Sequence, residues 1–115
     1  MKTALFIITS DPRREGRAAE GIRIAAGVAA WQKVAVRVYL DTAAARALAG
    51  TADALEDVTL IRQCLPMVGT RATPVLVPEG DLTGLDSTVW ETEFSGVDPK
   101  NLAGLAAGSD WVMRF

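Results

Sequence analysis

The sequence predicts an α/β fold, a three-layer α/β/α sandwich built on a mostly parallel sheet of about five strands. Two observations carry this prediction. Apolar, β-branched runs alternate with helical patterns on short connections, an order typical of parallel sheets with helices on both faces. The first run, residues 3–9, is continuously apolar, as expected for a central strand covered on both sides. The 115 residues, half of them hydrophobic, suit a single domain, which we assign to residues 1–115.

The first half of the chain is predicted to contain two strands and two helices. A polar loop over residues 10–16 follows the first strand and leads into a helix over residues 17–31. One wide face of this helix is rich in alanine, which suits close packing on a sheet. Residues 34–40 form a second strand that ends at Asp41, and residues 42–49 form a short helix that Gly50 ends.

The second half is predicted to add two strands and two helices. Residues 53–68 have helical spacing, and Pro66 is expected to kink or end that helix near Cys64. Prolines bound a short strand at residues 74–78, and the polar segment 80–96 is expected to be a loop that can hold a short strand over 88–94. Asp98 and Pro99 favour a helix start, Gly108 ends that helix, and residues 111–115 are the last strand.

Composition excludes several kinds of chemistry. The chain has no histidine and one cysteine, Cys64, which rules out Ser-His-Asp and Cys-His nucleophiles, histidine-ligated metals and disulfides within the chain. The net charge of -2, without a basic run, argues against nucleic-acid and membrane partners. No glycine-rich phosphate motif follows a strand, and we expect neither a metal nor a cofactor. With no export signal or membrane-spanning run, the expected location is the cytoplasm.

Polar residues at the carboxyl ends of the predicted strands are the candidate ligand-binding site, because ligands of parallel α/β sheets bind there. These residues are Ser10, Asp11, Arg13, Asp41, Glu79 and Asp81. We interpret them as a shallow polar crevice for a small molecule or a partner peptide. The alternative gives Asp11 and Asp41 a structural role as helix N-caps and leaves Arg13 as a solvated loop charge.

A second apolar stripe on the first helix predicts that the protein is a homo-oligomer. Ile24, Val28 and Trp31 form this stripe, away from the alanine-rich face. Trp90 is expected at the same interface, with a place in the core as the alternative, since exposed apolar patches mark interfaces and tryptophan is enriched there. In the alternative, the segment 80–96 folds over the stripe within one monomer through Val89, Trp90 and Phe94.

Three segments, FIITSDP, VAVRVYLD and NLAGLAAGSDWVMRF, together with the order of elements, give the chain a resemblance to the DsrE/DsrF-like sulfur-relay family. The resemblance covers nearly the whole chain. It implies a small α/β protein that assembles into a trimer or hexamer and has other sulfur-relay proteins as partners.

The same resemblance exposes a departure from the family pattern. Sulfur-carrying members place a cysteine just beyond the strand that corresponds to residues 74–77, where this chain has Pro78, Glu79 and Gly80. We therefore expect a non-catalytic binding or assembly module. The alternative is a sulfurtransferase or persulfide carrier that uses Cys64, a residue that its helical spacing otherwise identifies as a small buried hydrophobe.

Overall fold

The computed structural model, which describes residues 1–115, contains one five-stranded sheet in which every neighbouring pair of strands is parallel. The strand order is β4-β3-β2-β1-β5. The strands are β1 (Lys2–Ile8), β2 (Val34–Leu40), β3 (Val75–Pro78), β4 (Phe94–Val97) and β5 (Trp111–Arg114). The predicted α/β class and parallel sheet are confirmed, and β1 lies inside the sheet between β2 and β5.

Five α-helices and two 3-10 turns connect the strands. The helices are α1 (Arg17–Trp31), α2 (Thr42–Ala49), α3 (Val58–Val68), α4 (Ser87–Trp90) and α5 (Pro99–Gly108), and the 3-10 turns are η1 (Ala52–Ala54) and η2 (Glu79–Gly84). None of these helices is long and apolar enough to cross a membrane.

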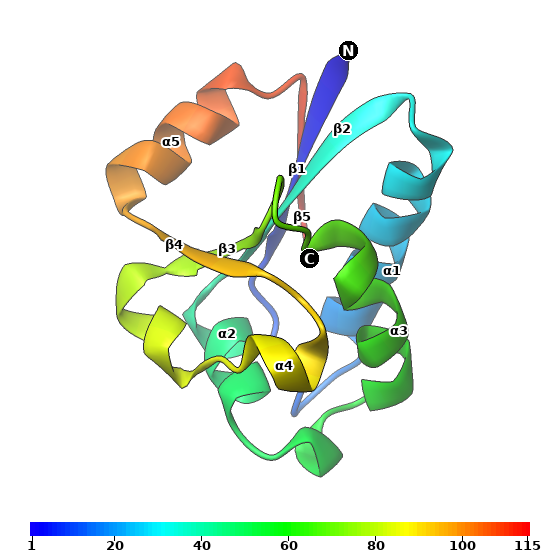
Figure 1. Ribbon diagram of the computed structural model, residues 1–115, viewed down its shortest axis with the longest axis vertical. Coiled ribbons are helices and arrows are strands. Elements are labelled where there is room, and N and C mark those ends of the chain that lie inside the picture. Colours follow the sequence, from blue (N-terminus) through cyan, green and yellow to red (C-terminus); the bar gives the residue numbers. More distant parts are fainter.

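The chain path explains how the helices divide between the two faces of the sheet. From β1 to β4 the strands advance in one direction, and the last connection then returns across the sheet to place β5 beside β1. Because parallel crossovers are right-handed, a reversal of direction moves the connecting helix to the opposite face. Figure 1 accordingly shows α5 on one side of the sheet, with α1 and α3 on the other.

The two faces are buried to very different extents. The face under α1 and α3 belongs to a core of 22 buried residues, in which alanines of α1 lie close to Phe6 and Val38 of the sheet. The opposite face has a cluster of four buried residues, Leu5, Ile7, Tyr39 and Leu76. The helix over that cluster, α5, has no buried residue of its own. One face of the sheet is therefore thickly covered and the other thinly.

Two predicted element boundaries are wrong. Pro66 does not end its helix near Cys64, because α3 continues to Val68 with Pro66 inside it. Leu65 and Val68 are both buried in the main core, and their burial stabilises the last turn despite the hydrogen bond that proline cannot donate. The same helix begins at Val58 rather than at residue 53, after the 3-10 turn η1.

The segment 80–96 is also more ordered than the loop that its polarity predicts. Residues 88–94 do not form a strand; the helix α4 occupies Ser87–Trp90, and the fourth strand begins only at Phe94. Asp86 caps α4, its carboxylate accepting hydrogen bonds from the backbone N–H groups of Thr88 and Val89 at 2.9 and 3.2 Å. This short helix directs Trp90 into the core.

Candidate functional site

Asp11 and Arg13, which follow β1, form an ion pair with each other. The Asp11 carboxylate accepts hydrogen bonds from the Arg13 backbone N–H at 2.9 Å and from Arg13 Nε at 3.0 Å, and its second oxygen lies 2.9 Å from Arg13 Nη2. The hydrogen bond from the Arg13 side chain is the main reason that the pKa of Asp11 lies below its ordinary value. Asp11 does not cap α1, whose N-cap is Gly16. Beside the pair, the Ser10 hydroxyl is buried without a hydrogen-bond partner.

A second polar group lies beyond the end of β2. Asp41 is at the N-cap position of α2 but makes no capping bond with its side chain; it accepts a hydrogen bond from the Tyr39 hydroxyl at 3.1 Å. Burial, followed by the nearby charges of Asp41 and Asp81, raises the pKa of Tyr39 to about 12. Asp81, in η2, forms an ion pair with Nε of Arg46 at 3.1 Å. The structure thus brings Asp41 and Asp81 near one another and adds Tyr39.

Tyr39 was not among the predicted site residues, although its place in the sequence points to the site. Residues two apart on a strand point to the same face, so a tyrosine two positions before Asp41 is expected to share its surface. Arg46 carried no comparable signal, because its partner Asp81 lies 35 residues away.

Glu79 begins η2 directly after β3. Its side chain forms no ion pair, and its backbone lies against β4: a Cβ atom added at Gly96 would come within 3.1 Å of Glu79 Cα. The absence of a side chain at Gly96 allows η2 to pack this closely on the strand. β3 thus ends at Pro78, and Glu79 and Gly80 begin the 3-10 turn η2 that follows it.

Cys64, the only thiol, lies away from these strand ends. It is in the middle of α3, half-buried and packed against the main core. Arg23 of α1 is close enough that Cys64 contributes slightly to the raised pKa of Arg23, whose main cause is the hydrogen bond to Glu20. That arginine is already paired with Glu20, with Nη2 and Oε1 2.5 Å apart.

The predicted interface residues differ in their surroundings. Ile24 and Val28 are half-buried and pack against the core of the same chain, because α3 lies beside α1. Their packing within the chain leaves them half-exposed. Trp31 is 65% exposed at the end of α1.

Trp90 is not a surface residue, which corrects the expectation that it lies at an interface. It is only 2% exposed, and its indole Nε1 donates a hydrogen bond to the backbone oxygen of Leu48 at 3.1 Å. The guanidinium of Arg62 lies 5.3 Å from the centre of its ring. A buried indole with a satisfied N–H is a core anchor between α4 and α2.

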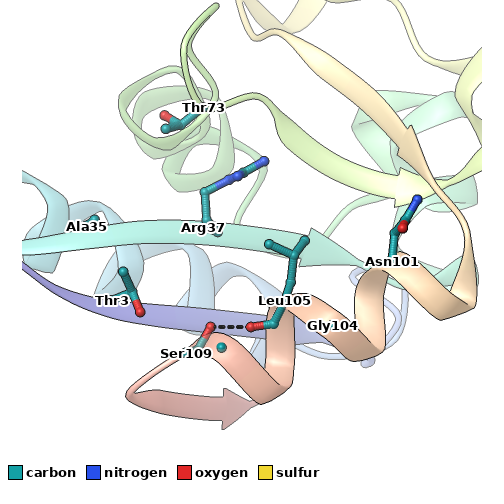
Figure 2. A pocket seen from close by; sticks show the side chains of 9 residues that line it. Thr3, Ala35, Arg37, Thr73, Asn101, Gly104, Leu105 and Ser109 are labelled. Carbon is teal, nitrogen blue, oxygen red and sulfur yellow. Dashed lines mark hydrogen bonds between the residues drawn. The ribbon is translucent and has the colours of Figure 1, made fainter.

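The structure contains one cavity, and the predicted crevice does not form part of it. Its volume is about 620 Å³, and it lies between α5 and the sheet, near the amino ends of β1 and β2 (Figure 2). The residues that line it are Thr3, Ala35, Arg37, Thr73, Asn101, Gly104, Leu105, Gly108 and Ser109. None of these residues was singled out in the sequence as a candidate.

The all-parallel sheet, its strand order and the division of its helices define a small α/β protein of the DsrE/DsrF-like fold. The chain is similar to the crystal structure of the YchN protein from E. coli, with a TM-score of 0.75, 16% sequence identity and coverage of 100% of both chains. No protein-family model matches the sequence, and no curated protein matches it. At this level of identity the similarity establishes the fold, which confirms the predicted fold class.

Proposed function

We propose that the protein is a non-catalytic binding or assembly module of the DsrE/DsrF-like fold, that it acts in the cytoplasm, and that its partners are itself and sulfur-relay proteins. One observation carries the proposal. β3 ends at Pro78 and is followed by Glu79 and Gly80, at the place where the sulfur-carrying members of the family that the sequence resembles have a cysteine. A chain without that thiol keeps the scaffold and lacks the carrier group.

The position of Cys64 supports the same proposal. A persulfide carrier needs an accessible thiolate beside a positive charge. Cys64 is half-buried in α3, the adjacent Arg23 is paired with Glu20, and the chain has no histidine that could act as a base. These surroundings are those of a small core residue of the helix layer.

Sulfur loading tests this proposal directly. Wild-type protein and Cys64→Ser are incubated with a low-molecular-weight persulfide donor, and intact mass is then measured before and after reduction. We expect no stoichiometric gain of a sulfur atom in either protein. A complete, reducible adduct on the wild type that is absent from Cys64→Ser would contradict the proposal and identify a sulfur carrier.

We also propose that the module is a homo-oligomer, with a trimer or hexamer implied by the family resemblance. The support is Trp31, which is 65% exposed, together with the thin cover of the sheet on the α5 side. Light scattering of the wild type, Trp31→Glu and the control Val89→Glu tests this, since Val89 is also exposed but lies in α4. We expect an assembly that Trp31→Glu dissociates and Val89→Glu leaves intact; a monomeric wild type at micromolar concentration would refute the proposal.

A further inference from the structure

Arg37 is an unusual residue for its position in the sheet. It lies in the middle of β2, opposite Leu5 of β1, on a strand with neighbours on both sides. Figure 2 shows its side chain standing off the strand beside Leu105 of α5. The residue is partly exposed, but its Nε is buried, and a buried donor without a hydrogen-bond partner is costly.

No group of the protein neutralises this arginine. The four ion pairs of the structure use other cations, namely Lys2, Arg13, Arg23 and Arg46. Arg37 Nε is buried and is the only buried side-chain nitrogen without a hydrogen-bond partner. No acidic residue lines the cavity. The cavity therefore contains a positive charge and a free donor that no side chain satisfies.

The other walls of the cavity supply polar groups and open space. The side-chain amide of Asn101 donates one N–H to the Asp98 carboxylate, with nitrogen and oxygen 3.3 Å apart, and its second N–H is free. Thr3, Thr73 and Ser109 add hydroxyl groups to the lining, and these are already hydrogen-bonded within the protein, to Asp110, Thr70 and the Leu105 carbonyl. On α5, a Cβ atom at Gly104 or Gly108 would meet nothing within 4 Å, so contacts within the monomer do not require glycine there. Both glycines are less favourable than alanine in a helix and leave this wall open.

We propose that the cavity beside Arg37 binds a small organic anion through a carboxylate or phosphate group. The fork of Nε and Nη donors on a guanidinium matches two oxygens of either group, and it gives Arg37 the partner that the protein itself lacks. A volume of about 620 Å³ accommodates more than a bare ion and is typical of small-molecule sites. The site is separate from Cys64 and from the carboxyl ends of the strands.

Nuclear magnetic resonance on ¹⁵N-labelled protein tests this site. The probes are phenyl phosphate and benzoate, with benzyl alcohol as a neutral probe of similar shape. We expect saturable shifts of the Arg37 Nε–H signal and of the Gly104 and Gly108 amide signals with at least one anion, and none with benzyl alcohol. The anion that binds more tightly distinguishes phosphate from carboxylate recognition.

Three variants make the result specific. Arg37→Gln is expected to weaken binding at least about tenfold, since it removes charged hydrogen bonds. The control Arg17→Gln removes the same charge from an exposed, unpaired position on α1, on the other face, and is expected to bind like the wild type. Should Arg37→Gln fail to fold, Arg37→Lys, which keeps the charge and loses the fork, is expected to bind several-fold more weakly.

Two results would overturn the proposal. One is the absence of saturable shifts at the cavity with either anion, including the case in which another copy of the chain covers it. The other is an equal loss of affinity in Arg37→Gln and Arg17→Gln, which would show that the anions respond only to overall charge.

Discussion

The two glycines within α1 offer a matched test of how this helix packs on the sheet. Gly21 is buried, and a Cβ atom there would lie 2.7 Å from Ile8 Cδ1 and 2.7 Å from Phe115 Cγ. At Gly27 the same atom would meet nothing within 4 Å. Gly21→Ala and Gly27→Ala therefore make one chemical change in one helix with opposite consequences for packing.

The expected free energies follow from these distances. Alanine is favoured over glycine in a helix interior by about 1 kcal/mol, so Gly27→Ala is expected to stabilise the protein by about that amount. At Gly21 this gain is opposed by overpacking, which costs about 1–3 kcal/mol. Phe115 cannot move aside freely, because its N–H donates to the Ile7 carbonyl at 2.9 Å and its ring stacks on Phe6 with centroids 6.1 Å apart. After the gain is subtracted, Gly21→Ala is expected to destabilise the protein by up to about 2 kcal/mol.

Thermal and urea unfolding measure both variants on one scale. Gly27→Ala is expected to raise Tm by about 4 °C and Gly21→Ala to lower it by up to about 8 °C, with no change in the urea m-value. If Gly21→Ala were as stable as Gly27→Ala, the reasoning would fail, because α1 would have to lie farther from Ile8 and Phe115 than the structure has it.

Three further measurements test polar contacts. Tyr39 is the single tyrosine, so its absorbance titration reports one group: we expect a midpoint near pH 12 and a lower one in Asp41→Asn, and the same midpoint in both proteins would refute the contact. Because this pKa lies above the ordinary value of 10.0, the contribution of the neutral Tyr39 to the free energy of unfolding is fully present below pH 10. That contribution is lost as the pH rises toward 12. Asp98→Ala removes the acceptor of the Asn101 N–H at the start of α5 and is expected to cost about 1 kcal/mol; an unchanged urea midpoint would show that this cap contributes nothing. The lowered pKa of Asp11 predicts a contribution to the free energy of unfolding that is present above about pH 4, the pKa of this group in the unfolded chain, and is lost as the pH falls further. The loss is expected to be smaller in Arg13→Gln, and equal acid sensitivity of the two proteins would exclude the ion pair.

Local patterns were sufficient for the elements whose signals lie within a few residues. β1 and β2 were predicted from the continuous apolar run at residues 3–9 and the alternating run at 34–40. The start of α5 was predicted from Asp98 and Pro99. In each case the determining interaction is local: burial on both faces, or a carboxylate that accepts an N–H three residues on. Elements of this kind need no knowledge of the rest of the chain.

The remaining features depend on distant parts of the chain. Ile24 and Val28 look unpartnered on a helical wheel, and only the position of α3 shows that they are partly covered. Trp90 is buried because a helical turn directs it toward Leu48, 42 residues away. Arg37 is one polar residue in an alternating strand, and its lack of a partner is visible only once every neighbouring side chain has been placed. Pairing of charges is a tertiary property that spacing along the sequence does not encode.

The pairing of β1 with β5 has a consequence for folding during synthesis. β1 lies between β2 and β5, and the Thr3 N–H donates to the Asp110 carboxylate at 2.8 Å across 107 residues of sequence. On the ribosome, β1 therefore has one open edge until residues 111–114 have been made. Open strand edges attract other chains, and contacts between distant segments slow folding. The interval between completion of β2 and arrival of β5 is thus when the nascent chain is most exposed to mispairing, and when a chaperone that shields strand edges would have its largest effect.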